Sequence, residues 1–107
     1  MFEVQEGGRT VNGWIKPTRQ RESGLQSMCR EYAELRGWFC EKTEGKSKNG
    51  FPDFMFIRKG RVVFVEFKRD PDEEPTTQQK RRHRQMREHG AEVHVIDNFE
   101  TFCELFR

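Results

Sequence analysis

Apolar residues of the first predicted helix, at 22–36, recur every three or four positions and so share one helical face. They are Leu25, Met28, Cys29, Tyr32 and Leu35. Gly37 follows where a left-handed C-terminal cap is common. Two further helices are predicted, one at 76–89 that stops before Gly90 and one at 99–106.

β-Branched and aromatic residues dominate the segments 53–58 and 61–68, which a Lys-Gly pair at 59–60 joins. The pattern predicts a hairpin, because glycine supplies the positive φ that a two-residue turn requires. Both faces of these strands are apolar, which predicts a sheet covered on both sides. With further strands at 38–43 and 92–96, the order is αβββαβα.

This order indicates one α/β domain over residues 21–107, with a mixed central sheet flanked by helices. A chain of 107 residues suffices for one small core, and dimerisation would help to stabilise it. Residues 1–20 contain three glycines and a proline and have no clear periodicity. We expect them to form an N-terminal arm or a dimerisation segment.

Composition supports a folded domain. Hydrophobic residues make up 33% and charged residues 36%, but ten Phe and two Trp argue against disorder. The net charge of +2 does not by itself predict nucleic-acid binding. Its distribution is more informative, because residues 78–89 carry five Lys or Arg side chains against one acid, a density suited to phosphates.

Several classes of protein are disfavoured. Cys29, Cys40 and Cys103 are few, odd in number and far apart, so we expect reduced thiols and a cytoplasmic protein. No apolar run approaches the ~20 residues of a membrane span, and residues 1–13 lack a secretory signal. The histidines have no ligand spacing with one another or with a cysteine, so zinc is not expected.

Candidate chemistry lies at the open end of the hairpin. Counting outward from the turn pairs Asp53 with Glu66, and directly opposed residues project from the same face with Cβ atoms ~5 Å apart. Lys68, two residues beyond Glu66, joins that face. Opposed like charges destabilise a strand pair, and a divalent cation, which prefers carboxylate oxygens, would offset the repulsion.

Two alternatives stay open at this point. Acids at strand ends are commonly solvated, and Lys68 suits a surface salt bridge. A single β-bulge in either strand would also move Asp53 off the shared face.

The residues of this region resemble a known signature. Gly50-Phe51-Pro52-Asp53 followed by Glu66-Phe67-Lys68 is similar to the motif of the PD-(D/E)XK nuclease superfamily. The resemblance is closer to the VRR-NUC family, in which a Gly-x-Pro-Asp entry, a hairpin, a Glu-x-Lys strand end and a helix carrying Gln follow in order. Gln79 takes the last place, and the resemblance covers about residues 22–106.

The resemblance implies a restriction-endonuclease-like αβββαβ core and a phosphodiesterase that needs Mg²⁺ or Mn²⁺ and acts on DNA. Asp53 and Glu66 would bind the metal, with help from the Phe67 carbonyl oxygen, and Lys68 would position or polarise the attacking water. Gln79 would hydrogen-bond a water or a phosphate, although an ordinary surface amide is the alternative.

Glu22 is the remaining candidate metal ligand, since the family often carries an acid on its first helix. It lies one turn before Leu25 and should face the sheet. The alternative is a first-turn glutamate that interacts favourably with the helix dipole.

Basic residues in three places are candidates for contact with the DNA backbone. They are Lys42 in the first strand, Lys46 and Lys48 in the following loop, and Lys80, Arg81, Arg84 and Arg87 in the second helix. The family tends to carry a basic residue at the place of Lys42. Solvated surface charge is the alternative for each.

Stand-alone members of the family, common in phages and bacteria, look like dimeric resolvases. The resemblance therefore implies a Mg²⁺-dependent endonuclease for branched DNA such as a Holliday junction, acting as a homodimer without an organic cofactor in a bacterial or phage-infected cell. The alternatives are a flap-, nick- or single-strand-specific nuclease, a non-catalytic DNA-binding module and a small protein-interaction domain.

Overall fold

Helices and strands follow the predicted order in the computed structural model, which describes residues 22–43, 50–68 and 72–107. The elements are α1 (Glu22–Leu35), β1 (Phe39–Lys42), β2 (Phe54–Arg58), β3 (Arg61–Phe67), α2 (Thr77–Glu88), β4 (Glu92–Ile96) and α3 (Phe99–Leu105). Each predicted boundary lies within one residue of the observed one. The expected arm at 1–20 lies outside the described residues.

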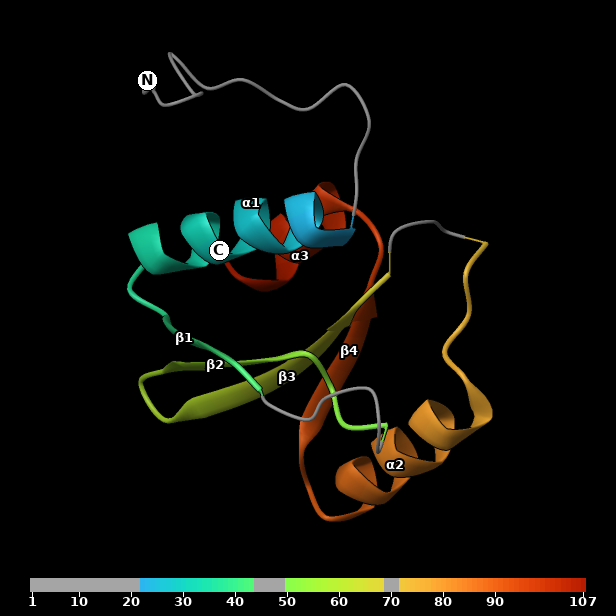
Figure 1. Cartoon of the computed structure of the whole chain (residues 1–107). Helices are drawn as coiled ribbons and strands as arrows, with labels where there is room; N and C mark the ends of the chain where they lie inside the picture. Colours follow the sequence, from blue (N-terminus) through green and yellow to red (C-terminus); the bar gives the residue numbers. More distant parts are fainter. Residues whose placement is uncertain (1–21, 44–49, 69–71) are drawn as a thin grey trace.

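The sheet is mixed, as predicted, with strand order β1-β2-β3-β4 (Figure 1). The first two pairings are antiparallel, whereas β3 and β4 are parallel and α2 lies between them in the chain. The hairpin register runs from Arg58↔Arg61 to Phe54↔Val65, as counting from the turn predicted. The turn residues Lys59 and Gly60 both have positive φ, at 50° and 85°.

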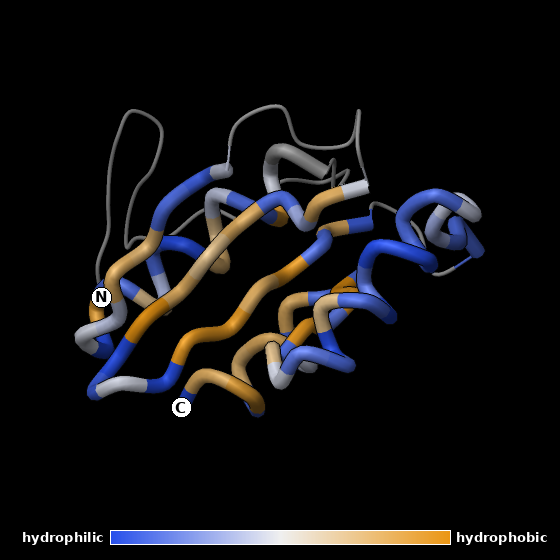
Figure 2. Tube along the Cα trace, turned by 90° about the horizontal axis from the view of Figure 1, so that it is seen from below, coloured by the Kyte–Doolittle hydropathy of each residue, from blue (hydrophilic) through white to orange (hydrophobic). Residues whose placement is uncertain are grey.

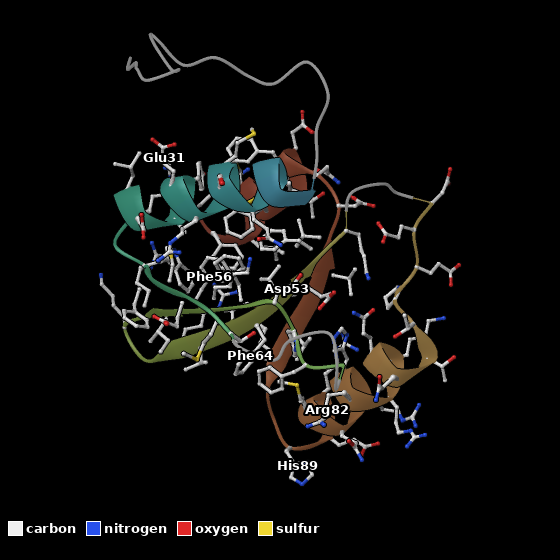
Figure 3. All side chains as sticks on the ribbon, viewed as in Figure 1. Glu31, Asp53, Phe56, Phe64, Arg82 and His89 are labelled. Atoms are coloured by element: carbon white, nitrogen blue, oxygen red, sulfur yellow. The ribbon has the colours of Figure 1, made fainter. Side chains whose placement is uncertain are left out.

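One face of the sheet carries the hydrophobic core beneath α1 and α3 (Figure 1). Alternate strand residues such as Phe56, which lies on the α1 side in Figure 3, are fully buried there. Phe102 and Phe106 of the C-terminal segment stack with ring centroids 4.0 Å apart. The Trp38 ring packs on Phe106 with centroids 4.7 Å apart and is 3% exposed, so it belongs to the core.

The other face is only partly covered, so the prediction of a sheet buried on both sides is wrong at the hairpin end. Phe39 is 54% exposed and Val62 is 39% exposed, and Ile57 pairs with both of them across the sheet. The physical reason is the composition of α2, which is almost wholly hydrophilic in Figure 2 and packs against β4. A polar helix gains little by covering an apolar strand surface.

All three cysteines are free thiols, as expected, and Cys29 and Cys40 belong to the core. Burial raises the pKa of the Cys40 thiol to about 11 and raises that of Cys29 as well, so both stay protonated near neutral pH. None of the helices in the described segments is long and apolar enough to cross a membrane.

Candidate active site

The two predicted carboxylates lie together at the end of the β2–β3 ribbon opposite the turn. Continuing the register one step beyond Phe54↔Val65 pairs Asp53, labelled in Figure 3, with Glu66. The backbone N–H of Phe67 donates to Oδ2 of Asp53 at 3.0 Å, which holds this carboxylate beside β3. Asp53 is 8% exposed and Glu66 is 2% exposed, so neither is a solvated strand-end acid.

Lys68 brings a buried cation to this pair. Its Nζ lies 3.5 Å from Oε2 of Glu66, and the residue is only 6% exposed. The backbone N–H of Lys68 donates to the Ile96 carbonyl at 2.8 Å, which attaches the end of β3 to β4. The alternative of a surface salt bridge therefore does not hold, because the ammonium is enclosed.

Gln79 connects α2 to the ion pair. Its Nε2 donates to Oε2 of Glu66 at 2.9 Å, and its Oε1 accepts from Nζ of Lys68 at 3.1 Å. The same Oε1 accepts from the backbone N–H of Thr76 at 2.9 Å, while Oγ1 of Thr76 accepts from the backbone N–H of Gln79 at 3.1 Å. Gln79 is thus both the third residue of a capping box and a partner of both buried charges.

Gly50 allows the segment that leads into β2 to contact the backbone of α2. A Cβ at this position would lie 2.6 Å from the Gln78 carbonyl oxygen, and the φ of Gly50 is +76°. Both facts demand glycine. On the other side, the backbone N–H and Oγ1 of Thr43 donate to the Asp53 carbonyl at 2.9 and 3.0 Å.

His83, one helical turn after Gln79, is 1% exposed. Burial, together with the charges of Arg87 and Lys68, lowers its pKa to about 4. The imidazole is therefore neutral near pH 7, and its burial is consistent with a packing role. Thr43, Thr76 and Gly50 were not predicted as supporting residues, because only the folded chain shows what they contact.

The donor set suits a hard divalent cation. Mg²⁺ is commonly held by one or two carboxylates, with water and substrate phosphates completing its coordination, and Asp53 and Glu66 supply two such groups. The Phe67 carbonyl, the third predicted ligand, belongs to the residue between Glu66 and Lys68. Within the described ranges, no cluster of three or more His, Cys, Asp or Glu side chains is suited to a metal ion. Glu22 begins α1, but its side chain lies outside the described residues.

The predicted DNA-contacting residues are dispersed. Lys42 is exposed at the end of β1, whereas Lys46 and Lys48 lie outside the described residues. On α2, Lys80 pairs with Glu74 at 3.2 Å, and Arg87 donates to the Val93 carbonyl at 2.8 Å, which ties the helix to β4. The two remaining candidates on this helix, Arg81 and Arg84, are exposed.

Solved structures with the same fold were found, whereas two sequence comparisons found no match. Neither a protein-family model nor a curated protein sequence matches the chain. A solved structure described as "VRR_NUC domain" is 30% identical, with a TM-score of 0.72, and the alignment covers 78% of this chain and 91% of that one. A second, "VRR_NUC domain protein", is 18% identical, with a TM-score of 0.67 and coverage of 82% and 86%, and supports the fold alone.

Proposed function

Because the chain belongs to the VRR-NUC family of the PD-(D/E)XK superfamily, we propose that it is a Mg²⁺- or Mn²⁺-dependent endonuclease that cuts branched DNA. The observation that carries the proposal is the buried convergence of Asp53, Glu66, Lys68 and Gln79. Burying two acids and an ammonium at one strand end is costly. A constellation kept at that cost is expected to serve chemistry.

Asp53, Glu66 and the Phe67 carbonyl would hold the cation, which supplies Lewis acidity toward the phosphate and acidifies water when bound. The Phe67 N–H fixes one oxygen of Asp53 at 3.0 Å and so sets the direction of the other. Lys68 would donate to the attacking water and stabilise the negative charge that develops on the phosphate. Gln79 keeps that ammonium in place through the 3.1 Å hydrogen bond to its Oε1.

Substrate choice is the finer part of the proposal. The likeness to stand-alone members of the family supports branched DNA, and a homodimer would present two sites for paired cuts in a four-way junction. The exposed guanidinium groups of Arg81 and Arg84 on α2 are suited to the flanking phosphates.

The test compares wild type, Lys68→Gln and Lys59→Gln on labelled four-way junction, flap, nicked and linear duplex DNA, with Mg²⁺, Mn²⁺ or EDTA. Lys59→Gln removes the same charge from the exposed hairpin turn. Wild type and Lys59→Gln should cut the junction only with metal, and Lys68→Gln should be slower by roughly 10²–10³-fold. Its DNA affinity should be nearly unchanged, because the ammonium is enclosed.

The outcomes separate the levels of the proposal. Preference for the flap, nicked or linear substrate would replace branched DNA as the target and leave the nuclease in place. Intact DNA of every form with both metals would contradict the nuclease itself. Full activity of Lys68→Gln would remove Lys68 from the mechanism.

A further inference from the structure

A pocket of about 230 Å³ opens between α1 and β1, on the face of the sheet opposite the carboxylates. Its lining residues are Gln26, Ser27, Arg30, Lys42 and Phe54. Lys42 pairs with Phe54 across the sheet, and Phe54 directly follows Asp53 in the chain. The pocket and Asp53 therefore lie at the same end of the sheet but on opposite faces of β2.

Hydrogen-bond donors in the pocket are available to a ligand. Arg30 donates through Nε to Glu34 at 3.1 Å and through Nη2 to the Cys40 carbonyl at 3.4 Å, so its guanidinium is held across α1 and β1. Its Nη1 makes no hydrogen bond to any described residue. Within the same part of the chain, the Lys42 ammonium has no hydrogen bond or ion pair.

The surroundings of the two cations favour an anion. Among the side chains that the structure describes, no carboxylate lines the pocket. Its floor is the ring of Phe54, which is 3% exposed and lies 6.0 Å from the Arg30 guanidinium carbon. An apolar floor excludes water from one side and so strengthens the attraction between a cation and a phosphate.

We propose that this pocket binds a backbone phosphodiester of the substrate DNA at the same end of the sheet as the candidate active site. The inference rests on the proposed function for the identity of the ligand, and it adds Arg30, which the sequence did not single out. Glu34 competes with the phosphate for Arg30 because it already pairs with the guanidinium. Removing either cation should weaken DNA binding, whereas removing Glu34 should strengthen it.

The experiment measures binding of the full chain to a labelled four-way junction in EDTA over a series of salt concentrations, so that no cutting is needed. Lys42→Gln should weaken binding and reduce the slope of log affinity against log salt by about 1. Lys59→Gln removes the same charge at the distant hairpin turn and should leave the slope unchanged. Arg30→Gln should act as Lys42→Gln does.

Glu34→Gln is expected to change the DNA affinity in the opposite direction. It should tighten binding, and Glu104→Gln, which removes an exposed acid from α3, should have no comparable effect. This pair guards against a loss of affinity that comes from misfolding alone, because a damaged protein would not bind more tightly.

If Lys42→Gln and Lys59→Gln weakened DNA binding equally, the effect would come from net charge alone, and the proposed phosphate pocket would be overturned. The pocket would also be overturned if Lys42→Gln lost the binding of inorganic phosphate but kept the DNA affinity of wild type. A protein that cuts DNA normally but lacks this dependence contradicts only the pocket. One that shows the dependence but never cuts contradicts only the proposed nuclease.

Discussion

Gln79 shows at the scale of one residue how three buried polar groups are made compatible with a small core. Its amide donates to Glu66 and accepts from Lys68, so both charges have a charge-assisted partner besides each other. A leucine here would leave the pair under-solvated in a site that excludes water. The amide is therefore as important to the stability of the site as it is to the proposed chemistry.

His83 gives a prediction about pH. Its folded-state pKa is lowered from 6.5 to about 4. Between these two pH values the imidazole is therefore protonated in the unfolded chain and neutral in the folded chain. The free energy of unfolding therefore falls as the pH drops from about 6.5 toward 4. Between pH 7 and 4.5, the free energy of unfolding of His83→Leu should fall by about 2 kcal/mol less than that of wild type. Urea denaturation at the two pH values measures this.

The control for this prediction is His89→Leu at the exposed end of α2. That variant should lose as much stability over the same pH range as wild type. If His83→Leu also followed the wild-type curve, the buried imidazole would not be a source of acid sensitivity.

At the scale of elements, α2 and α3 begin with side-chain caps of the same kind but with different consequences. Thr76 accepts from Gln79 N, and Asn98 accepts from Thr101 N at 2.8 Å. Thr76→Ala and Asn98→Ala should each cost about 1 kcal/mol of stability in thermal denaturation. Only Thr76→Ala should slow cleavage, by about tenfold, because a misplacement of an ångström can cost up to ~100-fold.

Thr76→Ser is the rescue variant, since a serine hydroxyl can make the same cap. It should restore the wild-type rate. Equal loss of activity in Thr76→Ala and Asn98→Ala would mean that the rate follows stability alone, and the coupling of the cap to Gln79 would be disproved.

Alanine variants of Gly50 and Gly60 distinguish the effect of a close backbone contact from the effect of backbone strain alone. Both have positive φ, but a Cβ at Gly60 meets nothing within 4 Å, whereas one at Gly50 meets the Gln78 carbonyl at 2.6 Å. Each alanine variant should lose about 1 kcal/mol from the left-handed conformation. Gly50→Ala should in addition push α2 away and lower the cleavage rate by roughly 100-fold, assayed under saturating Mg²⁺.

The comparison has a clear contrary outcome. Full activity of Gly50→Ala, or an equal loss in Gly60→Ala, would show that the distance between the entry loop and α2 does not control the site.

At the scale of the whole molecule, the buried carboxylates of Asp53 and Glu66 lie together at one end of the β2–β3 ribbon, so a bound cation should stabilise the fold. At a concentration one hundred times its dissociation constant, Mg²⁺ should add about 2.7 kcal/mol to the free energy of unfolding. Thermal denaturation with Mg²⁺ and with EDTA measures this. Asp53→Asn should abolish the difference, and Glu104→Gln should preserve it.

A rise in melting temperature that Asp53→Asn retains would place the cation elsewhere on the protein. Comparison with NaCl at equal ionic strength excludes a general salt effect.

The whole fold also shows which inferences local pattern supports. Helical spacing around Leu25 and the two β-branched and aromatic runs joined by a Lys-Gly turn predicted the elements closely, because both are local signals of the chain. The cover of the second sheet face was mispredicted, because strand composition does not reveal how far a polar helix such as α2 extends. Phe39 and Val62 are exposed for that reason.

The sequence alone determined the hairpin register as far as Phe54↔Val65, because a two-residue turn favours one alignment of its strands. It placed Asp53 opposite Glu66 only on the condition that no β-bulge intervened. Only the tertiary structure decided that Lys68 is enclosed, that Gln79 reaches both charges, and that Gly50 touches the backbone of α2. These contacts join residues far apart in the chain, and their distances depend on how α2 packs on the sheet, which no local pattern encodes.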